Sequence, residues 1–486
     1  MFKSGVSVMM IIFASRVLGL VRAATVAFYF GAGSVTDAYF SAFKISNFFR
    51  QLLGEGALGN AFIPVYNEAV EAYGEKKSRD LIFSVLNLIF VFSSLVTIVM
   101  ILGSGPIISV MAPGFDPATK KLASSLLKIM SVYFIFISLS GMICAVLNNY
   151  KKFAVPASTS IFFNLAIIGA SLWGSRRYGI YALTAGVVVG GAFQLLVVLP
   201  SFFAITRRYK LSIDWKDPYL RKIFVLMVPM LVGIVAREIN TFVDQLFASY
   251  LDPGGVSALE NATRLYLLPV GVFGISLSTI IFPALSKAVV RNDRAAAQKN
   301  ILQGLHILLF LIIPSICVLT VYGKDIIRLT LSYGKFGEEA VTVTGGALFY
   351  YALGLYFYTG IHLMTRAFYS MKDSKLPVAF SVISIAVNII LNFILIRFMR
   401  YKGLALATAC ASGVNFLLLF FVFRKKYLAL PLKKTGIFLG KTLITAAAAL
   451  LSSYFIKNTP ARLAVFSGCY MALWAGAFIK RKMEVF

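Results

Sequence analysis

Residues 81–103 read LIFSVLNLIFVFSSLVTIVMILG and contain no charged side chain. A helix needs about 20 apolar residues to cross the hydrocarbon core of a bilayer, so this run is long enough to span a membrane. Similar runs recur along the chain, which has 486 residues, 59% hydrophobic and 14% charged. Soluble domains have about 25% charged residues. The sequence therefore predicts an all-α polytopic membrane protein.

We expect about fourteen transmembrane helices. Apolar runs of suitable length lie at residues 6–30, 36–66, 81–103, 122–147, 156–174, 180–203, 223–250, 258–286, 301–322, 340–369, 377–397, 403–423, 437–456 and 463–479. The second, eighth and tenth are too long for one straight span. Gly54, Gly56 and Gly59 interrupt the second, and Pro269 and Gly271 the eighth, as is tolerated where a helix lines a cavity.

The net charge of +28 comes from lysines and arginines in short loops between the apolar runs. Loops on the cytoplasmic side of a membrane are enriched in these residues, so this charge reports topology and not nucleic-acid binding. With the N-terminus inside, the inner loops hold about twice as many cations as the outer loops. We therefore expect both termini to be cytoplasmic.

An internal repeat with a spacing near 220 residues divides the chain. Ala14-Ser15-Arg16 falls opposite Val235-Ala236-Arg237, Tyr150-Lys151-Lys152 falls opposite Met371-Lys372-Asp373, and Tyr178-Gly179 is echoed near Lys402-Gly403. An even number of spans per repeat predicts two parallel six-helix lobes with substrate held between them. The expected parts are an N-lobe at 1–215, a C-lobe at 216–430, and two further helices at 431–486.

Charged residues inside the apolar runs are the strongest indication of function. They are Arg16, Arg22, Asp37, Lys44, Arg50 and Glu55 in the first lobe and Arg264 in the second. Such residues are costly in a membrane and normally face a wet cavity or a partner. Arginine offers a planar fork that binds phosphate through two hydrogen bonds, so a cationic interior favours a large anionic substrate. The alternative is that the arginines pair with Asp37 and Glu55 and only hold helices together.

A second group carries oxygen ligands. Asn388 and Asn392 are four residues apart, hence on one helix face, and Asp244 and Thr408 lie in neighbouring predicted helices. These oxygens could hold a hard monovalent cation such as sodium, which would couple transport to an ion gradient. The alternative is hydrogen bonding between helices, which is common for Asn and Thr in membranes. No motif predicts another cofactor, and the run Gly436–Thr442 is one residue short of a P-loop.

Several stretches together resemble the MurJ/MviN family, the lipid II flippases of the multidrug/oligosaccharidyl-lipid/polysaccharide exporter superfamily. The resemblance rests on Ser15–Arg22, Gly31–Gly33, Thr36–Phe40, Ala42–Lys44, Arg50, Glu55–Ala57, Ala61–Pro64, Arg264–Leu265, Pro269, Pro283–Lys287 and Tyr333–Phe336. It spans nearly the whole chain.

The resemblance implies a cationic cavity between two lobes, in which Arg16, Arg22, Arg50 and Arg264 hold a diphosphate and a sugar-peptide head group. It assigns family acidic positions to Asp37 and Glu55, and it implies that the last two helices form a groove for the lipid tail. The expected protein is a monomer in the bacterial cytoplasmic membrane. It is not an enzyme but a secondary-type flippase that moves undecaprenyl-diphosphate-linked peptidoglycan precursor outward by alternating access, in contact with membrane lipids.

The sequence leaves two alternatives open. The chain could be a flippase for another polyprenyl-diphosphate-linked oligosaccharide, or a membrane scaffold for wall synthesis that transports nothing. A drug or cation antiporter would instead predict a cavity dominated by acidic residues, contrary to these arginines.

Overall fold

The computed structural model describes residues 2–51, 57–207, 209–456 and 458–480, and within these ranges the regular structure is entirely helical. Ten described helices are long and apolar enough to cross a membrane, or eleven when one bent pair is counted as a span. The remaining predicted spans correspond to α2, α9 and α19. The chain is therefore an all-α polytopic membrane protein, as the sequence predicted.

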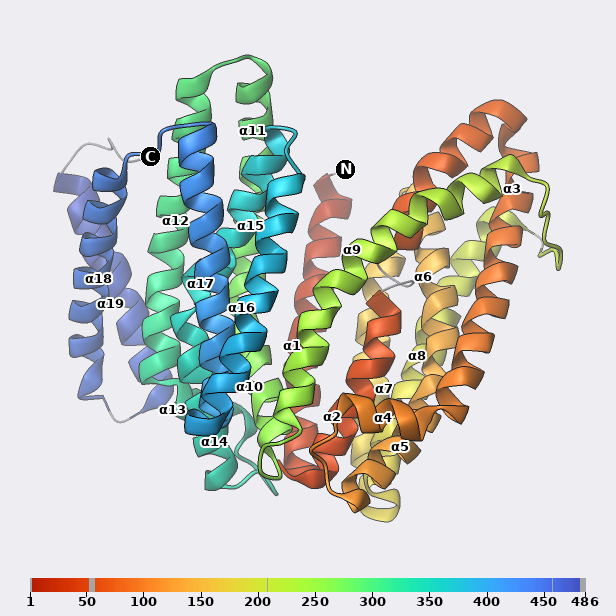
Figure 1. The fold of residues 1–486 in the computed structure, drawn as a ribbon, viewed down its shortest axis with the longest axis horizontal. Coiled ribbons are helices and arrows are strands. Elements are labelled where there is room, and N and C mark those ends of the chain that lie inside the picture. The colour runs from red at the N-terminus through yellow and green to blue at the C-terminus, as the bar shows by residue number, and fades with distance from the viewer. Residues whose placement is uncertain (1, 52–56, 208, 457, 481–486) are drawn as a thin grey trace. The chain divides into compact units, whose positions relative to one another are not determined.

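The first of two compact units comprises Met1–Ser257 with Thr330–Gly337. Its helices are α1 (Phe2–Phe30), α2 (Ser34–Phe49), α3 (Ala57–Leu102), α4 (Ser104–Met111), α5 (Pro117–Ser131), α6 (Tyr133–Asn149), α7 (Ala154–Tyr178), α8 (Ile180–Thr206) and α9 (Pro218–Ala248). Helix α7 packs along both α8 and α1 (Figure 1). This packing builds the walls of the candidate site.

The loop at 330–337 belongs to this first unit because it docks on the end of α1. The Lys335 amide donates to the Phe28 carbonyl at 2.9 Å. Gly31 and Gly334 have positive φ angles of 65° and 64°, and a Cβ at Gly334 would lie 2.3 Å from the Phe28 carbonyl oxygen. Only glycine fits so close an approach in the left-handed region.

The second unit comprises Ala258–Leu329 with Glu338–Phe486. Its helices are α10 (Gly255–Pro269), whose first turn lies in the first unit, η2 (Val270–Ile275), α11 (Ser276–Val290), α12 (Arg294–Val321), α13 (Gly323–Leu331), α14 (Glu338–Leu353), α15 (Leu355–Ser370), α16 (Lys375–Met399), α17 (Tyr401–Lys426), α18 (Leu432–Tyr454) and α19 (Thr459–Lys480). These two compact units do not coincide with the expected parts at 1–215, 216–430 and 431–486. Those lobe boundaries stay a prediction.

The long apolar runs are broken where the sequence suggested and also where it did not. The π-helix η2 directly follows Pro269, which confirms the predicted break there. The run at 340–369 is the bent pair α14 and α15, with an angle of 44°. In the second run, α2 ends at Phe49 and the next helix starts at Ala57, so the run is interrupted as predicted. A further kink at Gly74, with a non-helical φ of 74°, separates its end from the third span. Gly59 is helical, whereas Gly54 and Gly56 lie outside the described residues.

Backbone geometry supports the internal repeat. Lys151 and Lys372 both have positive φ, at 59° and 60°, and Gly179 and Arg400 do so at 56° and 49°. Both pairs have the spacing of about 220 residues. Gly179 separates α7 from α8, and Arg400 separates α16 from α17. The structural equivalent of Gly179 is therefore Arg400 and not Gly403.

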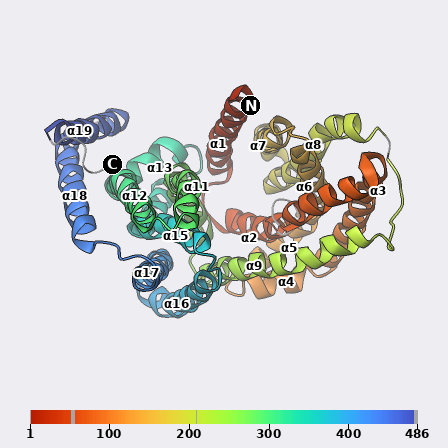
Figure 2. The same ribbon diagram turned by 90° about the horizontal axis from the view of Figure 1, so that it is seen from above.

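The last two helices attach to the second unit along α12 (Figure 2). Leu309 and Ile313 of α12 pack with Phe438 of α18 and with Phe466 and Trp474 of α19 in one buried cluster.

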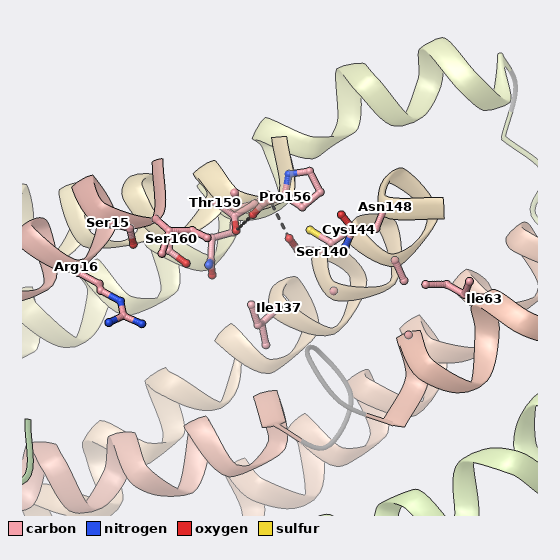
Figure 3. Close-up of a pocket in the computed structure, with 16 residues that line it drawn as sticks. Ser15, Arg16, Ile63, Ile137, Ser140, Cys144, Asn148, Pro156, Thr159 and Ser160 are labelled. Atoms are coloured by element: carbon pink, nitrogen blue, oxygen red, sulfur yellow. Dashed lines mark hydrogen bonds between the residues drawn. The ribbon is translucent and has the colours of Figure 1, made fainter. Parts of the chain in front are cut away.

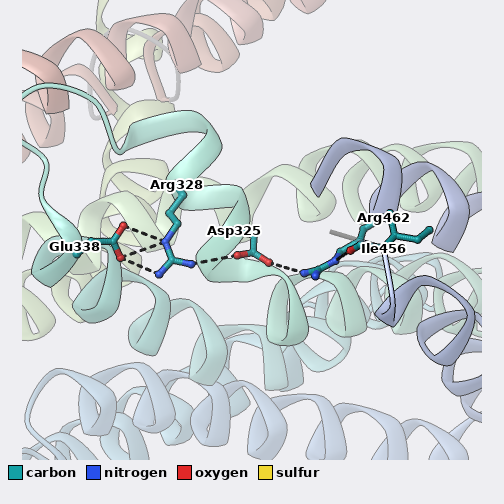
Figure 4. Close-up of polar contacts among 5 residues, drawn as sticks. All are labelled: Asp325, Arg328, Glu338, Ile456 and Arg462. Carbon is teal, nitrogen blue, oxygen red and sulfur yellow. Dashed lines mark hydrogen bonds and ion pairs between the residues drawn. The ribbon is translucent and has the colours of Figure 1, made fainter. Parts of the chain in front are cut away.

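A chain of ion pairs joins α19 to α13 and α14 (Figure 4). Arg462 donates to Asp325 at 3.2 Å, and Asp325 also accepts from Arg328 at 3.3 Å. Arg328 in turn donates to Glu338 at 2.8 Å. These charges are therefore part of the attachment of α19.

Candidate functional site

A pocket of about 530 Å³ lies inside the first unit, among α1, α3, α6, α7 and α8 (Figure 3). Ser15 and Arg16 of α1 lie at one side of the drawn pocket, and Cys144 and Asn148 of α6 lie at the other. Small residues at Gly59, Gly141, Ala145 and Ala157 leave the space open.

The wall from α6 presents polar residues in helical register. Ser140, Cys144 and Asn148 are spaced by four residues, so they follow one face of the helix. From α7 the pocket receives Thr159 and Ser160. Most of these groups are neutral hydrogen-bonding side chains.

Arg16 supplies the charge of this pocket and is the only ionisable side chain, apart from the thiol of Cys144, among its described lining residues. Its side chain is exposed although α1 is one of the membrane spans. The guanidinium makes no hydrogen bond or ion pair to any described residue. It is thus available to an anion, and the expectation that Arg16 faces a polar space agrees with this geometry.

The other predicted cations of the first unit lie elsewhere. Arg22 sits over the ring of Phe163, 5.6 Å from its centroid, and is half-buried. Arg50 donates from Nε to Asn47 Oδ1 at 2.7 Å. Neither residue lines the pocket of Arg16. A joint site for these arginines therefore stays a prediction.

Asp37 is buried, with 3% of its surface exposed, and it holds the start of α10. Its carboxylate accepts from the amides of Gly254 and Ser257 at 2.6 and 2.7 Å and from the Ser257 hydroxyl at 2.5 Å. Thr36 and Ser257, whose hydroxyls lie 2.8 Å apart, occupy equivalent positions in the repeat. Among the described residues, Asp37 therefore fixes helices through backbone amides and not through an arginine.

Lys44 lies in the same unbroken helix as Asp37, as its spacing predicted, and donates to Gln245 Oε1 of α9 at 3.1 Å. Glu55 lies outside the described residues. The substrate-binding roles given to Asp37, Lys44 and Glu55 stay predictions, and the contacts of Asp37 favour a structural role for that residue.

In the second unit, Arg264 pairs with Glu260 one turn earlier in α10, at 3.4 Å. Both side chains are about one quarter exposed. Glu260 was not among the residues singled out in the sequence, although its spacing of four residues from Arg264 is that of an ion pair on one helix face.

An apolar pocket of about 310 Å³ also lies within the second unit. Phe273 of η2, Pro314 and Val318 of α12, and Phe466 and Met471 of α19 line it. Such a surface fits hydrocarbon.

The predicted cation ligands are distributed over both units. Asn392 Nδ2 donates to Asn388 Oδ1 at 2.9 Å, and both side chains are buried, so the two asparagines do share a face of α16. Thr408 donates to the Leu404 carbonyl at 3.1 Å. Asp244 belongs to the first unit and accepts from Asn240 at 3.3 Å. A common site for these four residues stays a prediction.

Sequence reasoning missed the neutral wall of the pocket. Ser140, Asn148 and Gln194 line it, but they carry no charge and match no motif. The spacing of Ser140 and Asn148 within an apolar run was the available signal, whereas Gln194 comes from another helix.

The chain is similar in sequence to known proteins over most of its length. A family model described as lipid II flippase MurJ matches residues 26–472. A probable lipid II flippase MurJ of Vibrio cholerae is 35% identical over 86% of this chain and 82% of its own length. The lipid II flippase MurJ of Burkholderia cenocepacia is 30% identical over 86% of this chain and 82% of its own length.

Solved structures agree with these matches. A lipid II flippase MurJ in an inward closed conformation superposes with a TM-score of 0.85 and 30% identity, over 97% of this chain and 99% of that one. An inward-facing multidrug transporter of the MATE family superposes with a TM-score of 0.74 at 11% identity, over 89% of this chain and 98% of that one, which is a likeness of fold.

Proposed function

The chain belongs to the lipid II flippase MurJ family, and on that premise we propose that it carries lipid II from the inner to the outer leaflet of the bacterial cytoplasmic membrane. The likeness to a solved lipid II flippase over 97% of the chain is the observation that carries this proposal. The protein is a multi-pass membrane transporter and not an enzyme. Its substrate would be the undecaprenyl-diphosphate-linked peptidoglycan precursor.

Arg16 would bind the diphosphate. Its guanidinium offers parallel N–H donors to phosphate oxygens. Serine, threonine and amide side chains line the same pocket, and no described residue competes for its donors. Arg22, Arg50 and Arg264 would add positive charge along the path of the head group.

The lipid tail would stay in an apolar environment while the head group crosses. The apolar pocket between η2, α12 and α19 supports this separation, because its lining is almost entirely hydrocarbon. Moving the tail with the head group through polar space would instead expose apolar surface to water.

The protein would work by alternating access. The membrane potential or an ion gradient would supply the energy for translocation. Each elementary charge moved across the membrane is worth about 2.3 kcal/mol per 100 mV. A monovalent cation at Asp244, Asn388, Asn392 and Thr408 is part of the proposal, as are cytoplasmic termini and a monomeric state. The hydrogen-bonded asparagine pair supports the first of these.

Replacement of a host cell's own flippase by this chain tests the proposal. We expect the chain to restore growth after depletion of the host protein, and lipid II to reach the outer leaflet. Purified protein in vesicles should translocate lipid II as well.

Failure of translocation in vesicles, with growth restored, would favour the scaffold. Translocation of another polyprenyl-diphosphate-linked oligosaccharide but not of lipid II would favour the other flippase class.

A further inference from the structure

The side-chain oxygen of Gln194 in α8 is a buried acceptor that no described group satisfies. Only 6% of its surface is exposed, and its Oε1 has no hydrogen-bond partner within the described part of the chain. It lines the pocket that contains Arg16. A buried acceptor without a partner costs about 1–3 kcal/mol, so such groups in a native protein need an explanation.

The surroundings of Gln194 define what could satisfy it. A glutamine side chain has one acceptor oxygen and two N–H donors, a set that complements another amide. Asn148 and Ser160 line the same pocket and add neutral donors and acceptors, whereas the hydroxyl of Ser140 donates to the backbone carbonyl of Gln194 at 3.3 Å. The positive charge of Arg16 in this pocket disfavours a cation as the partner of Oε1.

We propose that this neutral wall of the pocket is a subsite for an amide group of the substrate's head group, with Gln194 as its central hydrogen-bonding residue. The inference rests on the proposed function, because the amide would be carried by a lipid whose diphosphate binds Arg16. The acetamido group of an N-acetylated sugar and a peptide bond share this chemistry.

Substitution of Gln194 tests the subsite, with three probes applied to the full-length protein in nanodiscs. The probes are lipid II, the same lipid with its disaccharide but no peptide, and polyprenyl diphosphate alone. We expect Gln194→Met to weaken lipid II binding about tenfold, which corresponds to one lost hydrogen bond of about 1.4 kcal/mol. Binding of polyprenyl diphosphate should be unchanged.

The probe without peptide separates the two sources of the amide. If Gln194→Met also weakens its binding about tenfold, the sugar acetamido group is the partner of Gln194. If Gln194→Met weakens the binding of lipid II alone, the peptide is that partner.

Ser138→Ala is the matched control. Ser138 of α6 is fully buried, its hydroxyl also lacks a described partner, and it does not line the pocket. Both variants remove an unsatisfied polar atom, so both should retain or raise thermal stability. Only Gln194→Met should change binding. Equal affinity of Gln194→Met and the natural protein for lipid II would overturn the subsite and leave water as the partner of Gln194.

The native thiol of Cys144 provides a second readout that needs no substitution in the pocket. Cys144 lines this pocket, whereas the exposed Cys410 lies in the other unit. We expect lipid II to slow modification of Cys144 by methyl methanethiosulfonate about tenfold, with no effect of polyprenyl diphosphate and no change at Cys410.

Modification of Cys144 at the same rate with and without lipid II would also overturn the subsite. Absence of binding by all three lipids would contradict the proposed function itself.

Discussion

Arg16 in the first unit and Arg328 in the second are the same residue type in opposite settings. Arg328 lies between Asp325 and Glu338, with donor-to-acceptor distances of 3.3 and 2.8 Å, outside the helices that pass as membrane spans. Arg16 lies inside a span, beside a polar pocket, and has no partner among the described residues. A charge inside a membrane span normally faces a wet cavity or a partner, whereas an exposed ion pair outside the spans contributes little to stability.

The largest expected effect comes from removing the unpaired arginine. Arg16→Ala should lower the affinity for polyprenyl diphosphate about 10- to 100-fold, since a hydrogen bond to a charged group is worth about 1.5–3 kcal/mol. Lipid II translocation should fall with it, while the unfolding temperature stays unchanged. Arg16→Lys keeps the charge but loses the planar fork. Its affinity for polyprenyl diphosphate should therefore lie between those of the natural protein and Arg16→Ala.

Arg328→Ala is the matched control for that experiment. It should leave binding and translocation close to those of the natural protein. If translocation survived Arg16→Ala but not Arg328→Ala, the roles assigned to the two arginines would be reversed.

Removal of the buried carboxylate should have the next largest effect, on stability. Asp37→Ala leaves the Gly254 and Ser257 amides without their acceptor, so we expect a loss of about 2–4 kcal/mol in the free energy of unfolding. Ser257→Ala removes one hydrogen bond and should cost about 1 kcal/mol. Thermal unfolding of both variants measures this. A fully stable Asp37→Ala protein that cannot bind lipid would return Asp37 to the substrate site.

A smaller effect is expected at the ion pairs of α19. Arg462→Ala breaks the contact to Asp325 and the packing of the guanidinium over Tyr322, 5.8 Å from the ring centroid. Because both charges remain about one quarter exposed, the loss should be about 1 kcal/mol or less. Unfolding experiments measure it, and translocation assays should show less than a twofold change. If Arg462→Ala impaired translocation as much as Arg16→Ala does, an ion-pair partner would not distinguish structural arginines from arginines that bind the substrate.

The smallest effect concerns acid stability at a paired charge outside the spans. The Tyr427 hydroxyl and the Lys426 ammonium donate to Asp373 at 2.6 and 3.0 Å, and they lower the pKa of that carboxyl to about 2. Its contribution to stability should be constant from neutral pH down to about pH 4, where the unfolded carboxyl titrates, and should vanish as the pH falls through 2.

Unfolding temperatures between pH 7 and pH 2 test this dependence. Asp373→Asn should show a shallower loss below pH 4. Identical profiles would mean that the Tyr427 and Lys426 contacts do not stabilise the protein.

Much of the fold could be predicted because it depends on local composition. The run at 81–103 is apolar along its whole length, and Pro269 marks the break that η2 occupies. The kink at Gly74, where φ is 74°, lies between the second and third predicted spans, where the sequence predicted a loop.

The candidate site was only partly predictable. Arg16 was found because a charge in an apolar run is conspicuous. Gln194 was missed because its importance depends on helices that are distant in sequence.

The amino-acid sequence by itself determined the membrane class, the spans, the repeat and the charges that a membrane must accommodate, since the cost of burying each residue in hydrocarbon adds up along the chain. Only the tertiary structure decided which charges are paired. Asp37 meets Ser257 and Arg462 meets Asp325 across more than a hundred residues, and Arg16 meets no described partner. Pairing depends on distance in space, and packing of the helices sets that distance.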